Sequence, residues 1–238
     1  MSAPALLQVD GLSAWYGRAQ ILFDVALEVG QGEVVALMGR NGAGKSTTLK
    51  AIAGLVERTS GEVRFRGQPI RGDEPYRIAR RGLGYVPEDR RIFTELSVRE
   101  NLEVGRQPAR EGAPGWTPEK LFRVFPNLGE MPGRPGGRMS GGEQQMLTVA
   151  RTLMGNPHLV LLDEPSEGIA PKIVEDMANM ILELKQEGLS VLLSEQNLHF
   201  ARLVSDRAYV IEKGQIRYSG TIAELAADES VQGEYLCV

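Results

Sequence analysis

The chain has 238 residues, of which 42% are hydrophobic and 24% charged, proportions typical of a folded protein with one sizeable core. Its net charge of −4 argues against a general nucleic-acid binder, and no apolar run is long enough to span a membrane. Cys237 stands alone, which excludes an intrachain disulfide and favours a cytoplasmic setting. Residues 1–10 lack the basic end and long apolar stretch of a signal peptide, so we expect none.

Two β-strands are predicted near the start of the chain, over residues 6–9 and 21–29. Between them lie Trp15, Tyr16 and Gly17, which predict an aromatic loop. The Tyr16 ring could stack on a purine base, but stacking tolerates any base and is a weak signal alone. A ring that packs on its own hairpin explains the same residues equally well.

A glycine-rich stretch stands between an apolar run over residues 34–38 and a segment of helical spacing over residues 48–55. Its members are Gly39, Arg40, Asn41, Gly42, Ala43, Gly44, Lys45, Ser46 and Thr47. A strand, G-x-x-x-x-G-K-S and a helix in this order predict a phosphate-binding loop. Its glycines let backbone N–H groups converge on an anion, while Lys45 can bridge the β- and γ-phosphates and Ser46 can bind Mg²⁺. The alternative is a glycine-rich turn with a chance Lys-Ser pair, and the flanking pattern disfavours it.

Shorter elements follow the phosphate loop. The spacing predicts a strand over residues 61–67, a helix over 75–81 and a strand over 83–87. Residues 88–93 then form a charged loop with an apolar tip. Ser97, with a glutamate three residues later, has the capping-box spacing of a helix start.

Proline and glycine recur between residues 105 and 138, around one helical segment over residues 119–125. We interpret this region as an inserted helical lobe. It is no linker between independent domains, because the phosphate-loop core is incomplete before it.

A further helix is predicted to begin after Ser140 and to run to about residue 155. Ser140 and Glu143 have capping-box spacing, which explains both residues without any ligand. It leaves Gly141 and Gly142 unexplained, since glycines weaken a first turn but let an anion approach bare N–H groups. The stretch therefore also predicts an anion site.

The apolar run over residues 159–162 predicts a buried strand that ends in two carboxylates, Asp163 and Glu164. An aspartate at the tip of a core strand beside a phosphate loop is the usual second Mg²⁺ anchor. Because side chains alternate along a strand, Glu164 would point elsewhere and could deprotonate water. The alternative, a simple turn, is disfavoured by the presence of Lys45 and Ser46.

The rest of the chain predicts a helix over residues 171–186, a strand over 190–194, a hairpin over 209–218 and a last helix from residue 221. The strand over 190–194 ends in the polar residues Glu195, Gln196 and Asn197. His158 and His199 lack the spacing of a zinc site.

In their order, these motifs resemble those of an ATP-binding cassette (ABC) subunit across nearly the whole chain. Tyr16 is similar to the adenine-stacking aromatic, Gly39–Thr47 to the Walker A loop and Ser140–Glu143 to the family signature. Residues 159–163 resemble Walker B, and Glu164 stands at the position of the catalytic glutamate. Four motifs in the right order make the resemblance specific.

The resemblance implies an α/β fold. It would have a RecA-like phosphate-loop NTPase core, an N-terminal antiparallel β subdomain and an inserted α-helical subdomain. Residues 1–238 would form a single nucleotide-binding domain. Within it, residues 1–87 and 158–238 would make the core and the β subdomain, and residues 88–157 the helical subdomain with the signature helix.

The chain departs from the family's commonest pattern at three positions. Glu88 stands where a loop usually supplies glutamine, Glu143 where the signature usually ends in glutamine, and Gln196 where the switch residue is usually histidine. Together with residues 166–171, these look like the smaller of the two cassettes of branched-chain amino-acid importers. Urea and short-amide importers have similar cassettes, and an exporter cassette matches poorly. A soluble ABC-type ATPase not coupled to transport is a further alternative.

The resemblance also implies how the site works. Two cassettes, identical or different, would pack head to tail with ATP and Mg²⁺ between them, so that the Walker A loop of one faces the signature of the other. Glu164 would act as the base, and Gln196, whose amide donates hydrogen bonds but carries no charge, as a neutral positioner. Ser46 and Asp163 would hold Mg²⁺, and Glu88 would face the metal or pair with an arginine.

The implied partners are transmembrane permease subunits and, indirectly, a solute-binding protein. The loop over residues 88–93 and the inserted lobe would touch the permease. The chain would then lie on the cytoplasmic face of the inner membrane as a peripheral protein. We expect no nucleic-acid partner.

Overall fold

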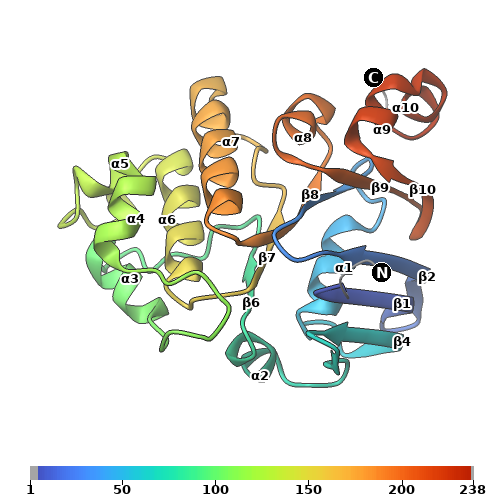
Figure 1. The fold of residues 1–238 in the computed structure, drawn as a ribbon, viewed down its shortest axis with the longest axis horizontal. Helices are drawn as coiled ribbons and strands as arrows, with labels where there is room; N and C mark the ends of the chain where they lie inside the picture. Colours follow the sequence, from blue (N-terminus) through green and yellow to red (C-terminus); the bar gives the residue numbers. More distant parts are fainter. Residues whose placement is uncertain (1–4, 237–238) are drawn as a thin grey trace.

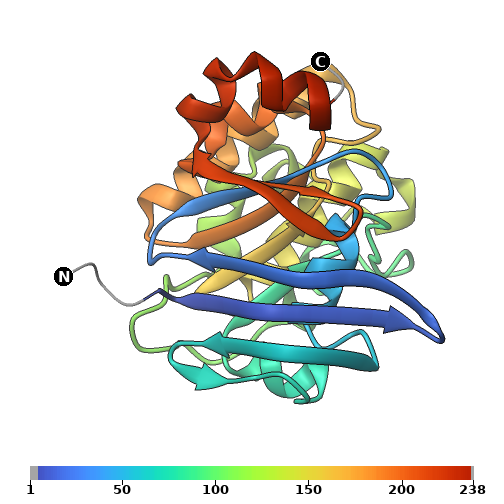
Figure 2. The ribbon, with the colours of Figure 1, turned by 90° about the vertical axis from the view of Figure 1, so that its right-hand side faces the viewer.

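The molecule consists of two β-sheets and the helices packed around them (Figure 1, Figure 2). The computed structural model describes residues 5–236, so Cys237 and the first four residues lie outside the described residues. A six-stranded sheet has the order β10-β9-β3-β8-β7-β6, and a four-stranded sheet the order β2-β1-β4-β5. The strands are β1 Leu7–Tyr16, β2 Ala19–Val29, β3 Val34–Met38, β4 Arg58–Phe65, β5 Gln68–Pro69, β6 Leu83–Val86, β7 Leu159–Asp163, β8 Ser190–Glu195, β9 Arg207–Glu212 and β10 Gln215–Thr221.

Helices lie in several connections between these strands and, after β10, near the end of the chain. They are α1 Lys45–Ile52, α2 Pro75–Arg80, α3 Val98–Gly105, α4 Pro118–Val124, α5 Pro126–Gly129, the 3₁₀ turn η1 Gly136–Arg138, α6 Gly141–Leu153, α7 Pro171–Gln186, α8 Leu198–Val204, α9 Ile222–Ala227 and α10 Glu229–Tyr235. Helices α3 to α6 gather on the side of the molecule away from β1, β2 and β4 (Figure 1).

The centre of the six-stranded sheet is parallel and buried. Strand β3 pairs in parallel with β8 and β9, and β7 pairs in parallel with β8 and β6. Every residue of β3, β7 and β8 is buried, as their largely apolar sequences require. Alternate residues of β3 serve two hydrophobic clusters, Val34, Ala36 and Met38 on one face and Val35 and Leu37 on the other. Because β3, β7 and β8 run parallel, the loops that follow them meet at one edge of the sheet.

The four-stranded sheet is antiparallel throughout and shares a hydrophobic cluster with α1. Gly214, in the turn between β9 and β10, joins the two sheets. Its N–H donates to the carbonyl of Ala43 at 2.8 Å, and its carbonyl accepts from the N–H of Phe23 at 2.8 Å. A Cβ on Gly214 would lie 1.9 Å from the carbonyl oxygen of Ile21, so only glycine permits this approach.

The predicted α/β fold with an N-terminal antiparallel sheet and a helical part is confirmed. The helix after the phosphate loop begins at Lys45, earlier than predicted, because Gly44 adopts a left-handed conformation that caps it. It ends before Leu55, which is exposed. The short helices α8 and α10 have no counterpart among the elements predicted from the sequence. Helices α3 to α6 fall within residues 88–157, and the proposed subdomain boundaries themselves stay a prediction.

Candidate nucleotide-binding and catalytic site

The glycine-rich loop after β3 bends where its sequence allows it. Gly42 and Gly44 have φ angles of +78° and +115°, which are strained for residues with a Cβ. The N–H of Ala43 donates to the carbonyl of Arg40 at 3.1 Å, closing the turn. The hydroxyl of Thr48 donates to the carbonyl of Gly44 at 2.9 Å at the start of α1. The loop therefore turns directly into the first turn of a helix, the arrangement that binds phosphate.

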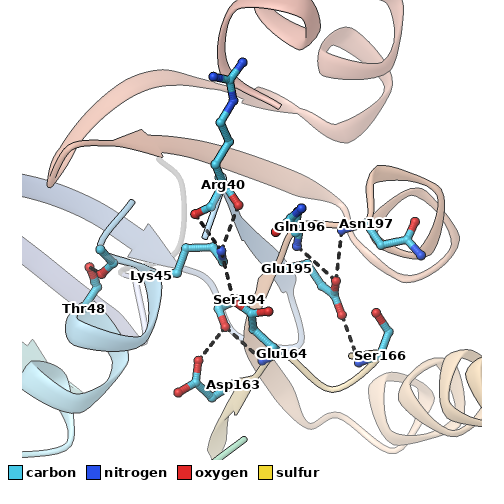
Figure 3. Close-up of polar contacts among 12 residues, drawn as sticks. Arg40, Lys45, Thr48, Asp163, Glu164, Ser166, Ser194, Glu195, Gln196 and Asn197 are labelled. Carbon is cyan, nitrogen blue, oxygen red and sulfur yellow. Dashed lines mark hydrogen bonds and ion pairs between the residues drawn. The ribbon is translucent and has the colours of Figure 1, made fainter. Parts of the chain in front are cut away.

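Lys45 connects this loop to the end of β7. Its side chain is buried, and its ammonium donates to the carbonyls of Gly39 at 2.8 Å and Arg40 at 3.1 Å. The same ammonium lies 3.0 Å from Oε1 of Glu164 (Figure 3). The structure thus brings the predicted phosphate-binding lysine and the predicted base together in one buried ion pair.

Asp163, the last residue of β7, is held from both sides. Its Oδ1 accepts from the hydroxyl of Ser194 on β8 at 2.8 Å, and its Oδ2 accepts from the hydroxyl of Tyr85 on β6 at 3.1 Å. Burial and then the charge of Asp163 raise the pKa of Tyr85, which keeps this hydroxyl a donor. Ser194 and Tyr85 lie in strands predicted from the sequence, but their role in orienting the carboxylate was not predicted.

Glu164 leaves the strand through an unusual backbone conformation. Its φ is +47°, in the left-handed region that few residues with a Cβ adopt. Its N–H donates to the hydroxyl of Ser194 at 3.0 Å, which supports this turn. The predicted separation of Asp163 and Glu164 therefore comes from a turn after the strand, and the explanation by strand alternation is wrong. The turn directs the Glu164 carboxylate toward Lys45.

A second carboxyl lies beside Glu164. A hydrogen bond with Glu164, followed by burial, raises the pKa of Glu167 to about 7. The charge of Glu88 raises it further, so Glu88 is part of the same acidic surroundings. At Glu164 burial opposes ionisation, but the hydrogen bond with Glu167 and the Lys45 ammonium outweigh it and lower its pKa. The sequence offered no signal for Glu167 beyond its place three residues after the predicted base.

No ion pair of Glu88 with an arginine is found within residues 5–236. The neighbouring Arg91 pairs instead with Asp89, with Nε 2.8 Å from Oδ2. Arg90 adopts a φ of +60°, and its guanidinium lies against Gly141. Arg91 therefore neutralises Asp89 rather than Glu88.

Gln196 follows β8 and lies close to the phosphate loop and to Glu164. Gln196 and Glu164 line a cavity of about 530 Å³, together with Glu167 and with Asn41 of the phosphate loop. Figure 3 shows Gln196 and the Lys45–Glu164 pair on neighbouring loops at the same edge of the sheet. The structure thus brings together three loops that the sequence analysis assigned to nucleotide chemistry.

The predicted signature lies at the start of α6, where Ser140 is exposed and residues 141–143 are half-buried. The N–H of Glu143 donates to Ser140 Oγ at 3.3 Å, and the N–H of Ser140 donates to Glu143 Oε2 at 2.7 Å, so the capping box forms. A Cβ on Gly141 would lie 2.4 Å from Arg90 Nη1, and one on Gly142 would lie 2.9 Å from a methyl carbon of Ile173. Close neighbours therefore also account for the two glycines. Within residues 5–236, no hydrogen bond or ion pair joins residues 140–143 to the phosphate loop.

The two aromatic residues at the end of β1 differ in surroundings. The Arg58 guanidinium lies 4.8 Å from the Trp15 ring centroid, which covers one face of the indole. Tyr16 is 49% exposed, beside the turn that leads into β2. It belongs to the strand rather than to a loop, since β1 ends at Tyr16 and β2 begins at Ala19.

The oxygen donors at the site fit a hard cation such as Mg²⁺. Ser46 supplies a hydroxyl in the first turn of α1, and Asp163 a buried carboxylate at the end of β7. Among the described residues, no group of three or more His, Cys, Asp and Glu side chains could hold a metal by itself. Mg²⁺ commonly takes one or two protein oxygens and completes its shell with phosphates and water, which suits this donor set.

A parallel sheet, a strand that leads through a glycine-rich loop into a helix, a buried lysine and strand-end carboxylates define a phosphate-loop ATPase fold. The family model described as ABC transporter matches residues 22–167. The chain therefore belongs to the ABC transporter family and is an ATP-hydrolysing, nucleotide-binding subunit of a transporter. The resemblance stated from the sequence is confirmed.

Several relatives match nearly the full length of the chain. The high-affinity branched-chain amino acid transport ATP-binding protein BraG of Pseudomonas aeruginosa is 42% identical over 97% of this chain and 99% of its own. The probable branched-chain amino acid transport ATP-binding protein LivF of Archaeoglobus fulgidus is 35% identical over 98% of each chain. The lipopolysaccharide export system ATP-binding protein LptB of Haemophilus influenzae is 35% identical over 98% of this chain and 97% of its own.

Solved structures agree with this assignment. The ADP conformation of an ATP-binding cassette of an ABC transporter superposes with a TM-score of 0.82 at 28% identity, covering 97% of this chain and 98% of that one. A nucleotide-free ATP-binding cassette gives a TM-score of 0.81 at 29% identity, covering 96% and 97%.

Proposed function

We propose that this chain hydrolyses ATP to power an importer of branched-chain amino acids. The observation that carries the proposal is the 42% identity to BraG over nearly the full length of both chains. The glutamine at position 196 and the acidic residue at position 88 agree with it, because they favoured this class of importer from the sequence. A urea or short-amide importer is the alternative with the same chemistry.

The geometry supports a division of labour for hydrolysis. Backbone N–H groups of Gly39–Thr47 and the Lys45 ammonium bind the phosphates, and Tyr16 stacks on the adenine. Ser46 and Asp163 hold Mg²⁺, which neutralises the developing charge on the phosphates when it is bound. Phosphate oxygens compete with Glu164 for the Lys45 ammonium.

Once Lys45 turns to phosphate, Glu164 becomes available to accept a proton from the attacking water. Gln196 orients that water or the terminal phosphate through its neutral amide. The shared cavity of about 530 Å³ that Asn41, Glu164 and Gln196 line supports these roles.

A second cassette completes the site. Ser140 is exposed and residues 141–143 are half-buried at the start of α6, so this helix end can receive the γ-phosphate of a nucleotide held by another chain. Ser140, Gly141, Gly142 and Glu143 would form that contact. Closure of the pair then depends on ATP, and hydrolysis releases it.

A groove of about 720 Å³ supports docking of a permease. It lies between α2, β6 and the C-terminal ends of α3 and α6. Its lining includes Tyr76 and Phe93, which are 53% and 48% exposed. Arg80, Arg91 and Arg151 also line it. An apolar groove with a cationic lining fits a permease segment that carries apolar and acidic side chains.

The loop that borders this groove is fastened to the signature helix. The hydroxyl of Thr148 on α6 donates to the carbonyl of Arg90, and Nη2 of Arg151 donates to the carbonyl of Arg91 at 2.6 Å. The Arg151 guanidinium also lies 5.1 Å from the ring centroid of Phe93. A permease that moves this loop therefore moves α6 and the signature at its first turn, which is how hydrolysis would be coupled to transport.

Among residues 5–236, the structure contains no helix with the length and apolarity that a membrane crossing needs. We propose that the chain reaches the cytoplasmic face of the inner membrane as a peripheral subunit bound to its permease.

Transport by the assembled complex tests the proposal. The chain is reconstituted in proteoliposomes with its permease subunits and solute-binding protein, and uptake of labelled leucine is measured with ATP. Leucine uptake that exceeds urea uptake and disappears in a complex carrying Glu164→Gln is expected. Uptake of urea instead of leucine, ATP-driven movement of lipopolysaccharide, or an ATPase that binds no permease would contradict it.

A further inference from the structure

Glu195 is a buried carboxylate with no assigned role in the site. It is the last residue of β8, and only 2% of it is exposed. Among the described residues no Lys, Arg or His forms an ion pair with it. A buried carboxylate without a cation is costly unless hydrogen bonds satisfy both of its oxygens, so its retention needs an explanation.

Both oxygens of Glu195 accept backbone N–H groups, and the donors come from two different loops. Oε1 accepts from Ser166 at 3.1 Å, in the loop after β7. Oε2 accepts from Gln196 at 3.1 Å and Asn197 at 3.2 Å, in the loop after β8 (Figure 3). The carbonyl of Glu195 also accepts from the N–H of Gly39 at 3.3 Å, at the start of the phosphate loop. One residue therefore touches all three loops of the candidate site.

The two loops that the carboxylate joins carry the groups proposed for hydrolysis. Ser166 lies two residues after Glu164, and Gln196 donates to Glu195 through its own N–H. We infer that Glu195 is a positioning residue for ATP hydrolysis, which fixes the Gln196 loop against the Glu164 loop so that both face the same phosphate. The inference rests on the proposed roles of Glu164 and Gln196.

A carboxylate is the group that this geometry requires. Each of its oxygens must accept, and glutamine would replace one acceptor with an NH₂ group that faces a donor. An aspartate has two acceptors, but its side chain is one methylene shorter and cannot span the same two loops. Burial raises the pKa of Glu195 and the N–H donors oppose this, so the ionised group is kept at a cost that a neutral amide would avoid.

The test compares Glu195→Gln with the wild-type chain in the assembled complex, through kcat, the KM for ATP and the melting temperature. We expect kcat to fall about 10-fold to 100-fold, because small misplacements of reacting groups have effects of this size. The KM for ATP stays within about twofold, since the phosphate loop is unchanged. Glu195→Asp keeps the charge but not the reach across the two loops, so it should also lower kcat while the KM for ATP stays within about twofold.

Asp206→Asn is a matched control at the far end of the same sheet. Asp206 also accepts a backbone N–H, that of Val34 at 2.9 Å, and forms an ion pair with Lys185. This substitution should lower the melting temperature and leave kcat unchanged. A second control adds Gln196→Ala to Glu195→Gln. If Glu195 acts through the Gln196 loop, the double variant should be little slower than the slower single variant.

The inference is overturned if either Glu195 variant keeps the wild-type kcat. It is also overturned if kcat and ATP affinity fall together with the melting temperature, or if the double variant shows the product of the two single effects. Retained hydrolysis in Glu164→Gln would instead show that the proposed base is wrong, whatever the Glu195 variants do. Loss of activity in Glu164→Gln with normal Glu195 variants would reject this inference alone.

Discussion

Two regions of this chain are proposed to touch ATP, and they are built in opposite ways. At the edge of the sheet, Lys45, Asp163 and Glu164 are buried, charged and joined to one another or to neighbouring strands. At the start of α6, Ser140 is exposed and its polar groups are satisfied within the first turn of its own helix. The first region is held together by contacts between core strands and loops, whereas in the described part of the chain the polar groups of Ser140 are bonded only within the first turn of α6.

Under the proposed head-to-tail pairing, the difference indicates which part of the site each chain supplies. Parallel strands place the groups of the first region at one edge, so a folded chain alone can bind nucleotide there. The N-terminus of α6 has the N–H groups of an anion site but no bond to the phosphate loop of its own chain among residues 5–236. Substitutions in the first region should therefore change how the isolated chain handles ATP, and substitutions in the second should change ATP chemistry only in the assembled pair.

The largest effect is expected for Glu164→Gln in the assembled complex. The amide keeps the shape of the side chain but cannot accept a proton from water, so hydrolysis should fall at least about 100-fold. ATP binding should persist, and the closed pair should accumulate with ATP and Mg²⁺. The ATPase rate and the fraction of dimer by light scattering measure both results. Because a different partner cassette has its own base, the experiment is repeated with that base removed, and near-normal hydrolysis in this complex would reject the assignment.

The next largest effect is expected for Lys45→Ala in the isolated chain. Loss of a charge-assisted contact of about 1.5–3 kcal/mol should weaken ATP binding about 10-fold to 150-fold in a calorimetric titration. Lys50→Ala, also on α1 but outside the phosphate loop, provides the control and should bind ATP normally. Equal affinities for the two variants would count against the role of Lys45.

The first region was largely predictable from the sequence because its chemistry is local. The strand, the loop over residues 39–47 and the first turn of α1 are consecutive, so spacing alone placed Lys45 and Ser46. The apolar run before Asp163 likewise fixed the end of β7. What spacing did not provide was the left-handed turn at Glu164, which depends on a hydrogen bond to Ser194 on another strand.

Long-range contacts explain the other omissions. Glu195 is adjacent in sequence to Gln196, but its bond to Ser166 spans two strands and is invisible without the sheet order. The glycines at 141 and 142 were assigned to an anion, whereas the structure also places Arg90 and Ile173 against them. Short helices such as α8 lack a long periodic pattern, so packing rather than propensity decides them.

A smaller effect is expected when the cap of α6 is removed, and it separates the two regions. Ser140→Ala should lower the free energy of unfolding by about 1 kcal/mol through loss of the cap. Thr221→Ala is a matched control, because Thr221 forms the same capping box with Glu224 at the start of α9. Both variants should bind ATP normally as isolated chains and lose similar stability in urea unfolding.

In the assembled complex these two variants should differ. Ser140→Ala should slow hydrolysis several-fold, because the hydroxyl proposed to reach the partner's γ-phosphate is gone, whereas Thr221→Ala should not. Equal hydrolysis rates would mean that Ser140 is a helix cap and nothing more. Weakened ATP binding by the isolated Ser140→Ala chain would mean that the signature serves its own phosphate loop.

The smallest effect concerns the carboxyl pair of the first region and its dependence on pH. The pKa of Glu167 is raised from 4.5 to about 7, first by its hydrogen bond with Glu164 and then by burial. Its contribution to stability is therefore fully present below pH 4.5 and is lost as the pH rises through about 7. The lowered pKa of Glu164 acts in the opposite direction, and its contribution is lost only as the pH falls below 4.5.

The contributions of Glu167 and Glu164 to stability are lost in different pH ranges. Glu167→Gln therefore changes only the contribution that is lost as the pH rises through about 7. The amide can donate to Glu164 at every pH, so the decline in the free energy of unfolding between about pH 5 and about pH 8 should become shallower than in the wild-type chain. Urea unfolding at both pH values measures the difference. Glu62→Gln, which removes an exposed carboxylate paired with Arg64 on β4, should leave the wild-type slope unchanged. If Glu167→Gln and the wild-type chain have the same slope, the proton is not shared between Glu164 and Glu167, and the lysine alone holds the base in its ionised form.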